Sequence, residues 1–191
     1  MRVNYLLALL LLFPGLLQAE SELTAEEIEG LLAVKIRFAT HMAFNPSIIR
    51  AVEAQNGSEL SLAEIKKRDE SWKASKGNPN ALIREITQND VARYFQRRVE
   101  NNSAIDEVFL TDNQGANVAA YPPTSDYWQG DEEKWTASYN RGQGTVFIGP
   151  LEFDESTQKT QVQISAPVMS REQTIGVLVL GVSVDYLQTK Q

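Results

Sequence analysis

The chain has 191 residues, with 18 lysines and arginines against 25 acidic residues and a single histidine. Its net charge of −7 at pH 7 repels nucleic acid and anionic membrane surfaces, which excludes both as main partners. There is no cysteine, so stability must come from a hydrophobic core, and the length is enough for one domain.

Residues 1–19 have the pattern of a secretory signal peptide. One basic residue, Arg2, precedes an apolar run at 6–13, and a small residue stands at the expected cleavage point. Pro14-Gly15 interrupts the run well short of the roughly 20 residues of a transmembrane helix, and an uncleaved anchor is the alternative. Export without cysteine fits a bacterial envelope protein, so we expect a periplasmic protein with a single domain at 20–191.

Residues 24–100 have helical patterns throughout and form a predicted helical arm. The segment TAEE at 24–27 is a capping box, which predicts a helix start, and apolar residues then recur at helical spacing. Asn45-Pro46 indicates an N-cap followed by proline in the first turn. A second helix or a kinked continuation is therefore expected to end at Gly57.

Two further helical regions follow. A second capping box, SLAE at 61–64, opens a helix that should end at Gly77. Pro79 starts the next region, which carries an apolar stripe. The stripe consists of Leu82, Ile83, Ile86, Val91, Tyr94, Phe95 and Val99.

The apolar pattern changes from the helical to the strand period at Ile105. Five strands are expected, and they lie at about 105–111, 116–121, 145–148, 159–169 and 174–185. The last run is almost continuously apolar, which is typical of a central strand covered on both faces. Helices first and strands afterwards predict an α+β fold with a five-stranded antiparallel sheet over 105–187.

The fourth strand alternates between apolar and polar residues. Its apolar residues belong to the core, and its polar residues are expected to face solvent or line a cavity. The apolar set is Val162, Ile164 and Ala166, and the polar set is Gln161, Gln163 and Ser165.

The connection at 121–144 is long for a compact domain and rich in aromatic and acidic residues, which predicts that it folds over the sheet and encloses a small-molecule pocket. The candidate ligand-binding residues are Tyr121, Asp126, Tyr127, Trp128, Trp135 and Asp154. The alternative is that the aromatic residues only pack the connection onto the sheet. The spacing of Trp135 and Tyr139 predicts a short helix within it.

Three motifs resemble those of the Cache/PDC extracellular sensor domains, a PAS-like family of bacterial signalling receptors. They are the D-x-x-G turn at 112–115, D-Y-W-Q-G-D-E-x-K-W at 126–135 and I-G-V-L-x-x-G-V-x-V-D at 175–185. The resemblance covers about residues 24–189. It implies long helices on a curved five-stranded antiparallel sheet, with a ligand pocket between the sheet and the connection between strands two and three.

The resemblance also bears on ligand and partners. Ligands of the family are small molecules, often amino acids or carboxylates, and long helices of this architecture commonly pair across a two-fold axis, which implies a homodimer through the N-terminal helix. Members that bind amino acids carry an arginine near an R-x-W-Y segment, whereas this chain has Ser125-Asp126-Tyr127-Trp128 there. We therefore expect a small polar organic ligand whose recognition does not depend on that arginine.

Receptors of the family usually continue into a signalling module, and this chain ends at Gln191, so a separate membrane signalling partner is expected. A ligand-free interaction module that docks on such a protein through the helical arm is the alternative. A hydrolase with Asp126 and Asp154 as acid and base is the minor alternative. The chain lacks the G-x-S-x-G and H-E-x-x-H motifs and the D-x-D-x-D spacing of calcium sites, so no enzyme, metal or cofactor is expected.

Overall fold

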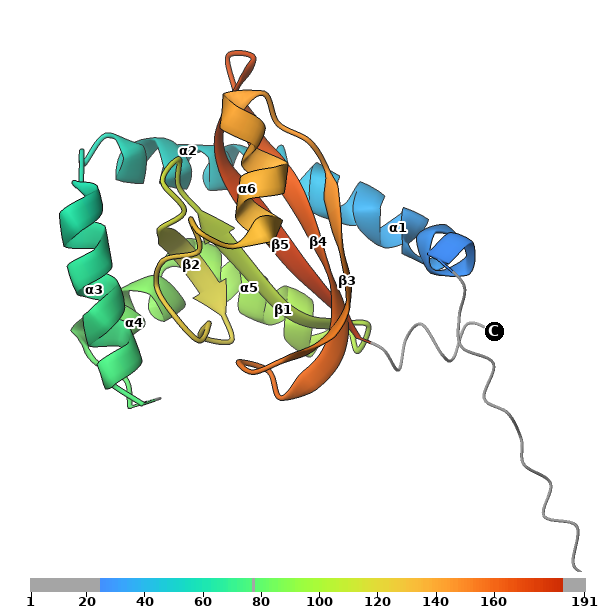
Figure 1. Cartoon of the computed structure of the whole chain (residues 1–191), viewed down its shortest axis with the longest axis horizontal. Helices are drawn as coiled ribbons and strands as arrows, with labels where there is room; N and C mark the ends of the chain where they lie inside the picture. The colour runs from blue at the N-terminus through green and yellow to red at the C-terminus, as the bar shows by residue number, and fades with distance from the viewer. Residues whose placement is uncertain (1–24, 77, 184–191) are drawn as a thin grey trace, which may run out of the picture.

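The computed structural model describes residues 25–76 and 78–183, which form six α-helices and one five-stranded sheet (Figure 1). The predicted signal peptide at 1–19, Gly77 and the end of the predicted fifth strand lie outside the described residues. Within the described part, no helix combines the length and the apolar character that crossing a membrane requires. The predicted α+β class with a five-stranded antiparallel sheet is confirmed.

Five helices precede the sheet, and the side-chain caps predicted for the second and third of them are present. The capping box predicted at 24–27 begins outside the described residues. The Asn45 side chain accepts a hydrogen bond from the Ser47 backbone, and Ser61 and Glu64 form a reciprocal capping box. Asn89 divides the region after Pro79 into two helices, because its side-chain oxygen Oδ1 accepts a hydrogen bond from the Ala92 N–H and caps the second of them. The helices are α1 (Ala25–Ala43), α2 (Pro46–Asn56), α3 (Leu62–Ala74), α4 (Ala81–Gln88) and α5 (Asp90–Glu100).

The sheet has the order β2-β1-β5-β4-β3, and all neighbouring strands are antiparallel. The strands are β1 (Ile105–Thr111), β2 (Asn117–Tyr121), β3 (Phe147–Asp154), β4 (Lys159–Ser170) and β5 (Gln173–Ser183). The apolar β5 is central, as predicted. Strand β3 extends to Asp154, beyond the predicted end at residue 148, because an edge strand tolerates Pro150 at a break in its pairing with β4.

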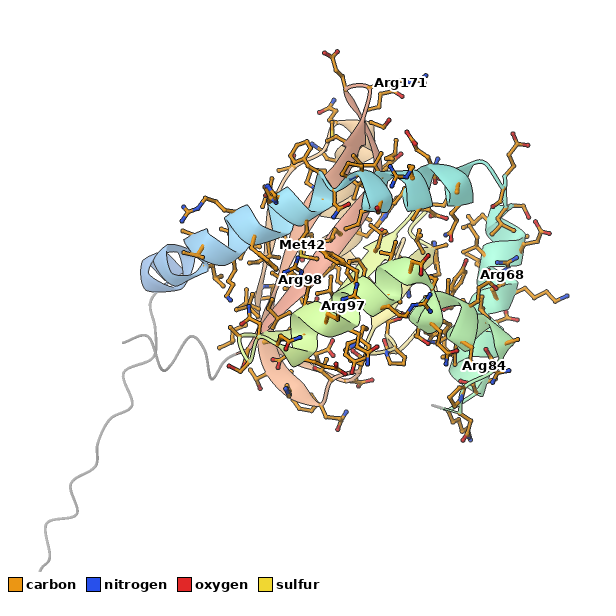
Figure 2. The ribbon with its side chains drawn as sticks, turned by 180° about the vertical axis from the view of Figure 1, so that it is seen from behind. Met42, Arg68, Arg84, Arg97, Arg98 and Arg171 are labelled. Atoms are coloured by element: carbon orange, nitrogen blue, oxygen red, sulfur yellow. The ribbon has the colours of Figure 1, made fainter. Side chains whose placement is uncertain are left out.

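One face of the sheet packs against α1, α2 and α5, and Figure 2 shows these helices in front of the strands when the molecule is seen from behind. This packing forms the larger core, to which α1 contributes Met42. Its larger members are Leu32, Met42, Ile48, Val52, Phe95, Val108, Leu110, Val162, Ile164, Leu178 and Leu180. Burial of this apolar surface is the main source of stability in a chain without disulfides.

The opposite face is covered by the connection between β2 and β3, which contains a short helix, α6 (Glu133–Tyr139). Figure 1 shows α6 in front of β4 and β5, with α3 and α4 beyond the β2 edge. A second core joins these elements to the sheet. The short helix was predicted from the spacing of Trp135 and Tyr139, whose rings stack with their centroids 4.7 Å apart.

Candidate functional site

Polar side chains from β1 and β4 gather on the face of the sheet that α6 covers. Strand β4 alternates, so Val162 and Ile164 enter the core behind the sheet while Gln161, Gln163 and Ser165 point forward. All three are at most 3% exposed, and Glu107 of β1 lies beside them at 1% exposure. The side-chain amides of Gln161 and Gln163 donate to Glu107 Oε1 at 2.6 Å and 2.7 Å. We call these four residues the polar floor.

Gly181 of the central strand makes room for the polar floor. A Cβ atom at this position would lie 2.2 Å from Gln161 Oε1 and 2.7 Å from Glu107 Cγ. Both distances are far below van der Waals contact, so only glycine lets the two side chains lie flat across β5. Gly181, the second glycine of the motif at 175–185, is therefore part of the site.

Two atoms of the polar floor are left without a hydrogen-bond partner. Gln161 Oε1 and Ser165 Oγ are buried, and nothing among the described residues bonds to either of them. A buried polar atom without a partner costs about 1–3 kcal/mol, and native structures rarely keep one without a reason. Donors from a bound molecule would satisfy both atoms.

Burial also changes the acidity of the floor. It raises the pKa of the Glu107 carboxyl to about 7, and the negative charge of Asp154 acts in the same direction. The bond from Gln163, the positive charge of Lys134 and the bond from Gln161 lower the pKa in part. Protonated and ionised Glu107 are therefore close in free energy at neutral pH, so a charged ligand would select one of them.

A cavity of about 310 Å³ adjoins the floor between α6 and β3. Its walls include Glu132, Lys134, Phe147, Gly149 and Glu152, and Gln163 connects it to Glu107. The Lys134 ammonium lies 2.7 Å from a Glu132 carboxylate oxygen and 5.6 Å from the centre of the Phe109 ring. The cavity has the size of a small-ligand site, and Gln163 is the residue of the polar floor that lines it.

Tyr127 and Trp128 anchor the connection to α3 and to the β1–β2 turn. Tyr127 is fully buried, and its ring centre is 6.0 Å from that of Trp72. The backbone N–H groups of Tyr127 and Trp128 donate to Asp69 Oδ1 at 2.9 Å and 3.1 Å. The Trp128 indole N–H donates to the Gln114 carbonyl at 2.8 Å. Both rings pack the connection, and their contact with a ligand stays a prediction.

The other aromatic candidates lie in two different places. The Tyr121 hydroxyl at the end of β2 donates to the Glu100 carboxylate at 2.8 Å, next to α5. The Trp135 indole N–H donates to the Asp112 carbonyl at 3.3 Å while its ring stacks on Tyr139. The structure therefore does not gather the predicted aromatic residues around one cavity.

Of the two acidic candidates, Asp154 lies near the polar floor. Asp154 ends β3 and accepts hydrogen bonds from the residues of the β3–β4 turn, and its charge acts on Glu107. The pKa of Asp126 is raised to about 6 by burial, by the charge of Glu132 and by that of Asp69, while Lys73 lowers it in part. Glu107 and Lys134 were missed as candidates, although the polar residues of β4 had indicated this face.

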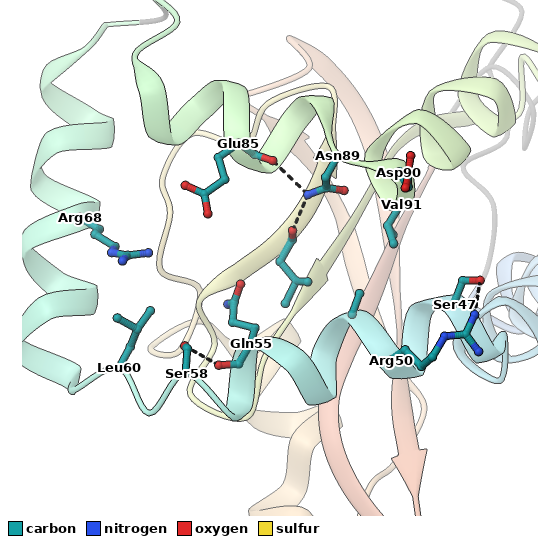
Figure 3. Close-up of a pocket in the computed structure, with 12 residues that line it drawn as sticks. Ser47, Arg50, Gln55, Ser58, Leu60, Arg68, Glu85, Asn89, Asp90 and Val91 are labelled. Carbon is teal, nitrogen blue, oxygen red and sulfur yellow. Dashed lines mark hydrogen bonds between the residues drawn. The ribbon is translucent and has the colours of Figure 1, made fainter.

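A larger groove of about 700 Å³ lies between α2, α3 and the α4–α5 junction (Figure 3). Arg68 and Glu85 point toward each other from opposite walls. The amides of Gln55 and Asn89 are already bonded, to Asp112 and to the Val118 carbonyl at 2.9 Å each. The groove is open and most of its polar groups are already hydrogen-bonded, so the polar floor is the better candidate site.

Across residues 25–76 and 78–183, acidic and histidine side chains form no group suited to a metal ion.

No protein-family model matches the sequence, and no curated protein does. Among solved structures, the sensor domain of E. coli DcuS is similar, with a TM-score of 0.54 and 12% identity over 86% of this chain and 97% of that domain. The ligand-binding domain of the Pseudomonas aeruginosa PAO1 amino acid chemoreceptor PctC, solved with GABA, has a TM-score of 0.50 and 13% identity over 86% of this chain and 59% of that one. The chain therefore has the Cache/PDC-type sensor fold that its motifs resemble.

Proposed function

We propose that the protein is a periplasmic sensor domain that binds a small polar organic ligand in the cavity between α6 and the sheet. The observation that carries this proposal is the polar floor, in which Glu107 and two unbonded acceptor atoms are buried beside a preformed cavity. The similarity in fold to sensor and ligand-binding domains supports it. The signal peptide at 1–19 provides the route to the periplasm.

Strand β4 offers a path from the ligand to the helical arm. Its forward residues Gln161 and Gln163 belong to the polar floor, and its backward residues Val162 and Ile164 belong to the core that packs against α1. A ligand that shifts β4 therefore shifts the surface on which α1 rests. Closely packed cores transmit such displacements because they have little free volume.

Helix α1 is where we propose that the signal leaves the domain. Val34 of α1 and Phe44, which directly follows the helix, are 55% and 57% exposed, although both side chains are large and apolar. A second copy or a membrane signalling partner that covers this helix would bury them. The alternative function is a ligand-free interaction module, in which the domain binds a partner through this surface but binds no ligand.

Catalysis by Asp126 and Asp154 has little support in the geometry. Asp126 lies 3.5 Å from the Lys73 ammonium and accepts a hydrogen bond from the Gln129 amide. Asp154 accepts hydrogen bonds from a backbone N–H and two hydroxyl groups in its own turn. Both carboxylates hold local structure, and we propose that the protein is not an enzyme.

A thermal-shift screen of the mature protein against amines, organic acids, amino acids and sugars tests the proposal. A ligand at 100 times its dissociation constant should stabilise the fold by about 2.7 kcal/mol. Gln163→Leu should abolish that shift, because it removes the amide that connects the cavity to Glu107. Gln88→Leu changes an exposed glutamine outside the cavity and is the matched control. A broad screen without any shift, or a shift that Gln163→Leu leaves intact, contradicts the proposal.

A further inference from the structure

Resting on the function proposed above, we propose that the ligand is a small organic cation with a primary ammonium group. The two unbonded atoms of the polar floor, Gln161 Oε1 and Ser165 Oγ, can both accept hydrogen bonds from a ligand. Gln161 Oε1 is an acceptor only, and both amide donors facing Glu107 are already used on its Oε1 atom. A primary ammonium brings three donors and no acceptor, which complements this set of atoms.

The charges around the cavity point the same way. Three carboxylates line it: Glu132 and Glu133 at the start of α6, and Glu152 on β3. Glu107 accepts a hydrogen bond from the lining residue Gln163, and the charge of Asp154 acts on Glu107. Among the residues lining the cavity, Lys134 is the one cation, and it is already paired with Glu132. The site therefore carries an excess of negative charge that a cationic ligand would neutralise.

Lys134 shows that an ammonium group is stable in this environment. Burial lowers its pKa, but the charge of Glu132, the bond to it, and the charges of Glu107 and Asp154 raise the pKa, with a net upward shift. Its ammonium also lies over the face of the Phe109 ring, an arrangement that favours cations. A ligand ammonium at the floor would meet the same groups.

An anionic ligand would meet the opposite conditions. The cavity wall holds no arginine. A carboxylate beside Glu107 would be repelled by it, and Lys134 would have to leave Glu132 to compensate. The ligand class is thus an amine without an essential carboxylate.

Three compounds with the same carbon skeleton test the inference: propylamine, 3-aminopropanoate and propanoate. Their dissociation constants for the mature protein are measured by calorimetry at pH 8 and equal ionic strength. Propylamine should bind more tightly than 3-aminopropanoate, and propanoate should not bind. Glu107→Gln should weaken propylamine binding by about tenfold or more, because it removes the buried charge. Glu85→Gln, which changes a carboxylate in the other groove, should leave the dissociation constant unchanged.

Two variants of the ion pair distinguish a cationic from an anionic ligand by the sign of their effect. Lys134→Met removes a competing positive charge, so it should tighten propylamine binding, whereas it would weaken the binding of an anion. Glu132→Gln keeps Lys134 but frees its ammonium, so it should weaken propylamine binding and would strengthen that of an anion. Glu132→Gln alone still distinguishes a cationic from an anionic ligand if Lys134→Met does not fold.

The possible failures of the two proposals are distinguishable. Binding of propanoate that is lost in Lys134→Met overturns the inference about the amine and leaves a sensor of another ligand. A broad screen in which neither the amines nor any other class binds overturns the proposed function itself. Propylamine binding that Glu107→Gln leaves unchanged also overturns the inference, because the ammonium is then held elsewhere.

Discussion

Replacing Glu107 by glutamine should make the protein more stable at neutral and alkaline pH. The pKa of this carboxyl rises from 4.5 to about 7 on folding, mainly because the charge is buried. Each pKa unit corresponds to about 1.36 kcal/mol, so ionised Glu107 costs the folded state about 3 kcal/mol. Glutamine carries no charge, and its amide oxygen can still accept the bonds that Gln161 and Gln163 donate.

The stability gain should depend on pH in a defined direction. Below about pH 4.5 the carboxyl is protonated in both the folded and the unfolded protein, so Glu107 costs nothing. Between pH 4.5 and about 7 the unfolded chain loses its proton first, and the wild-type protein becomes progressively less stable. Above pH 7 the full cost is present. The difference between Glu107→Gln and wild type should therefore grow from near zero to about 3 kcal/mol.

Urea unfolding followed by circular dichroism from pH 4.5 to 8.5 measures this difference without ligand. Glu85→Gln, which changes an exposed carboxylate outside the polar floor, is the control. Equal or lower stability of Glu107→Gln at pH 8, or a gap that does not change with pH, would refute the argument that burial of this charge opposes folding.

Three other substitutions have defined outcomes. Gly181→Ala should abolish ligand binding and lower the free energy of unfolding by about 1–3 kcal/mol, because the added Cβ collides with Gln161 Oε1. Calorimetry measures the binding and urea unfolding measures the stability, and normal binding would contradict the prediction. Asp69→Ala should lower the urea midpoint, because the backbone N–H groups of Tyr127 and Trp128 both lose their acceptor. Each lost hydrogen bond should cost about 1–3 kcal/mol. An unchanged midpoint would contradict this prediction. Ser165→Ala should keep or raise the melting temperature, because its hydroxyl is buried without a partner, and a marked decrease would show that the hydroxyl is bonded.

Local signals in the sequence were enough to predict most of the fold. Capping side chains such as Asn45 and Ser61 act on backbone groups within three residues, so the helix starts could be found without tertiary structure. The central position of β5 followed from its nearly continuous apolar character. The third strand was predicted too short, because an edge strand accepts a proline and exposed residues that would end a central one.

The candidate site was less predictable because it depends on contacts between distant segments. The alternation of β4 indicated a polar face, but only the position of α6 decides that Gln161 and Gln163 are buried rather than solvated. Strict alternation from Ile105 would place Glu107 behind the sheet, and an irregularity in the pairing between these two residues turns it forward. The local sequence contains no signal for that irregularity.

The aromatic residues of the connection illustrate the same limit. Tyr127 was predicted as a ligand contact because aromatic side chains often line small-molecule pockets. Its burial comes from Trp72 and Asp69 on α3, more than 50 residues earlier in the chain. Composition alone does not distinguish an aromatic residue that packs a connection from one that contacts a ligand.

A nuclear magnetic resonance titration of ¹⁵N-labelled protein tests the location of the ligand site most directly. The titrant is the strongest stabiliser from the thermal-shift screen. The account predicts saturable shifts that are largest for the backbone amides of Gln161, Gln163 and Gly181, which surround the polar floor. Shifts confined to the groove around Arg68 and Glu85, or no saturable shift, would contradict it.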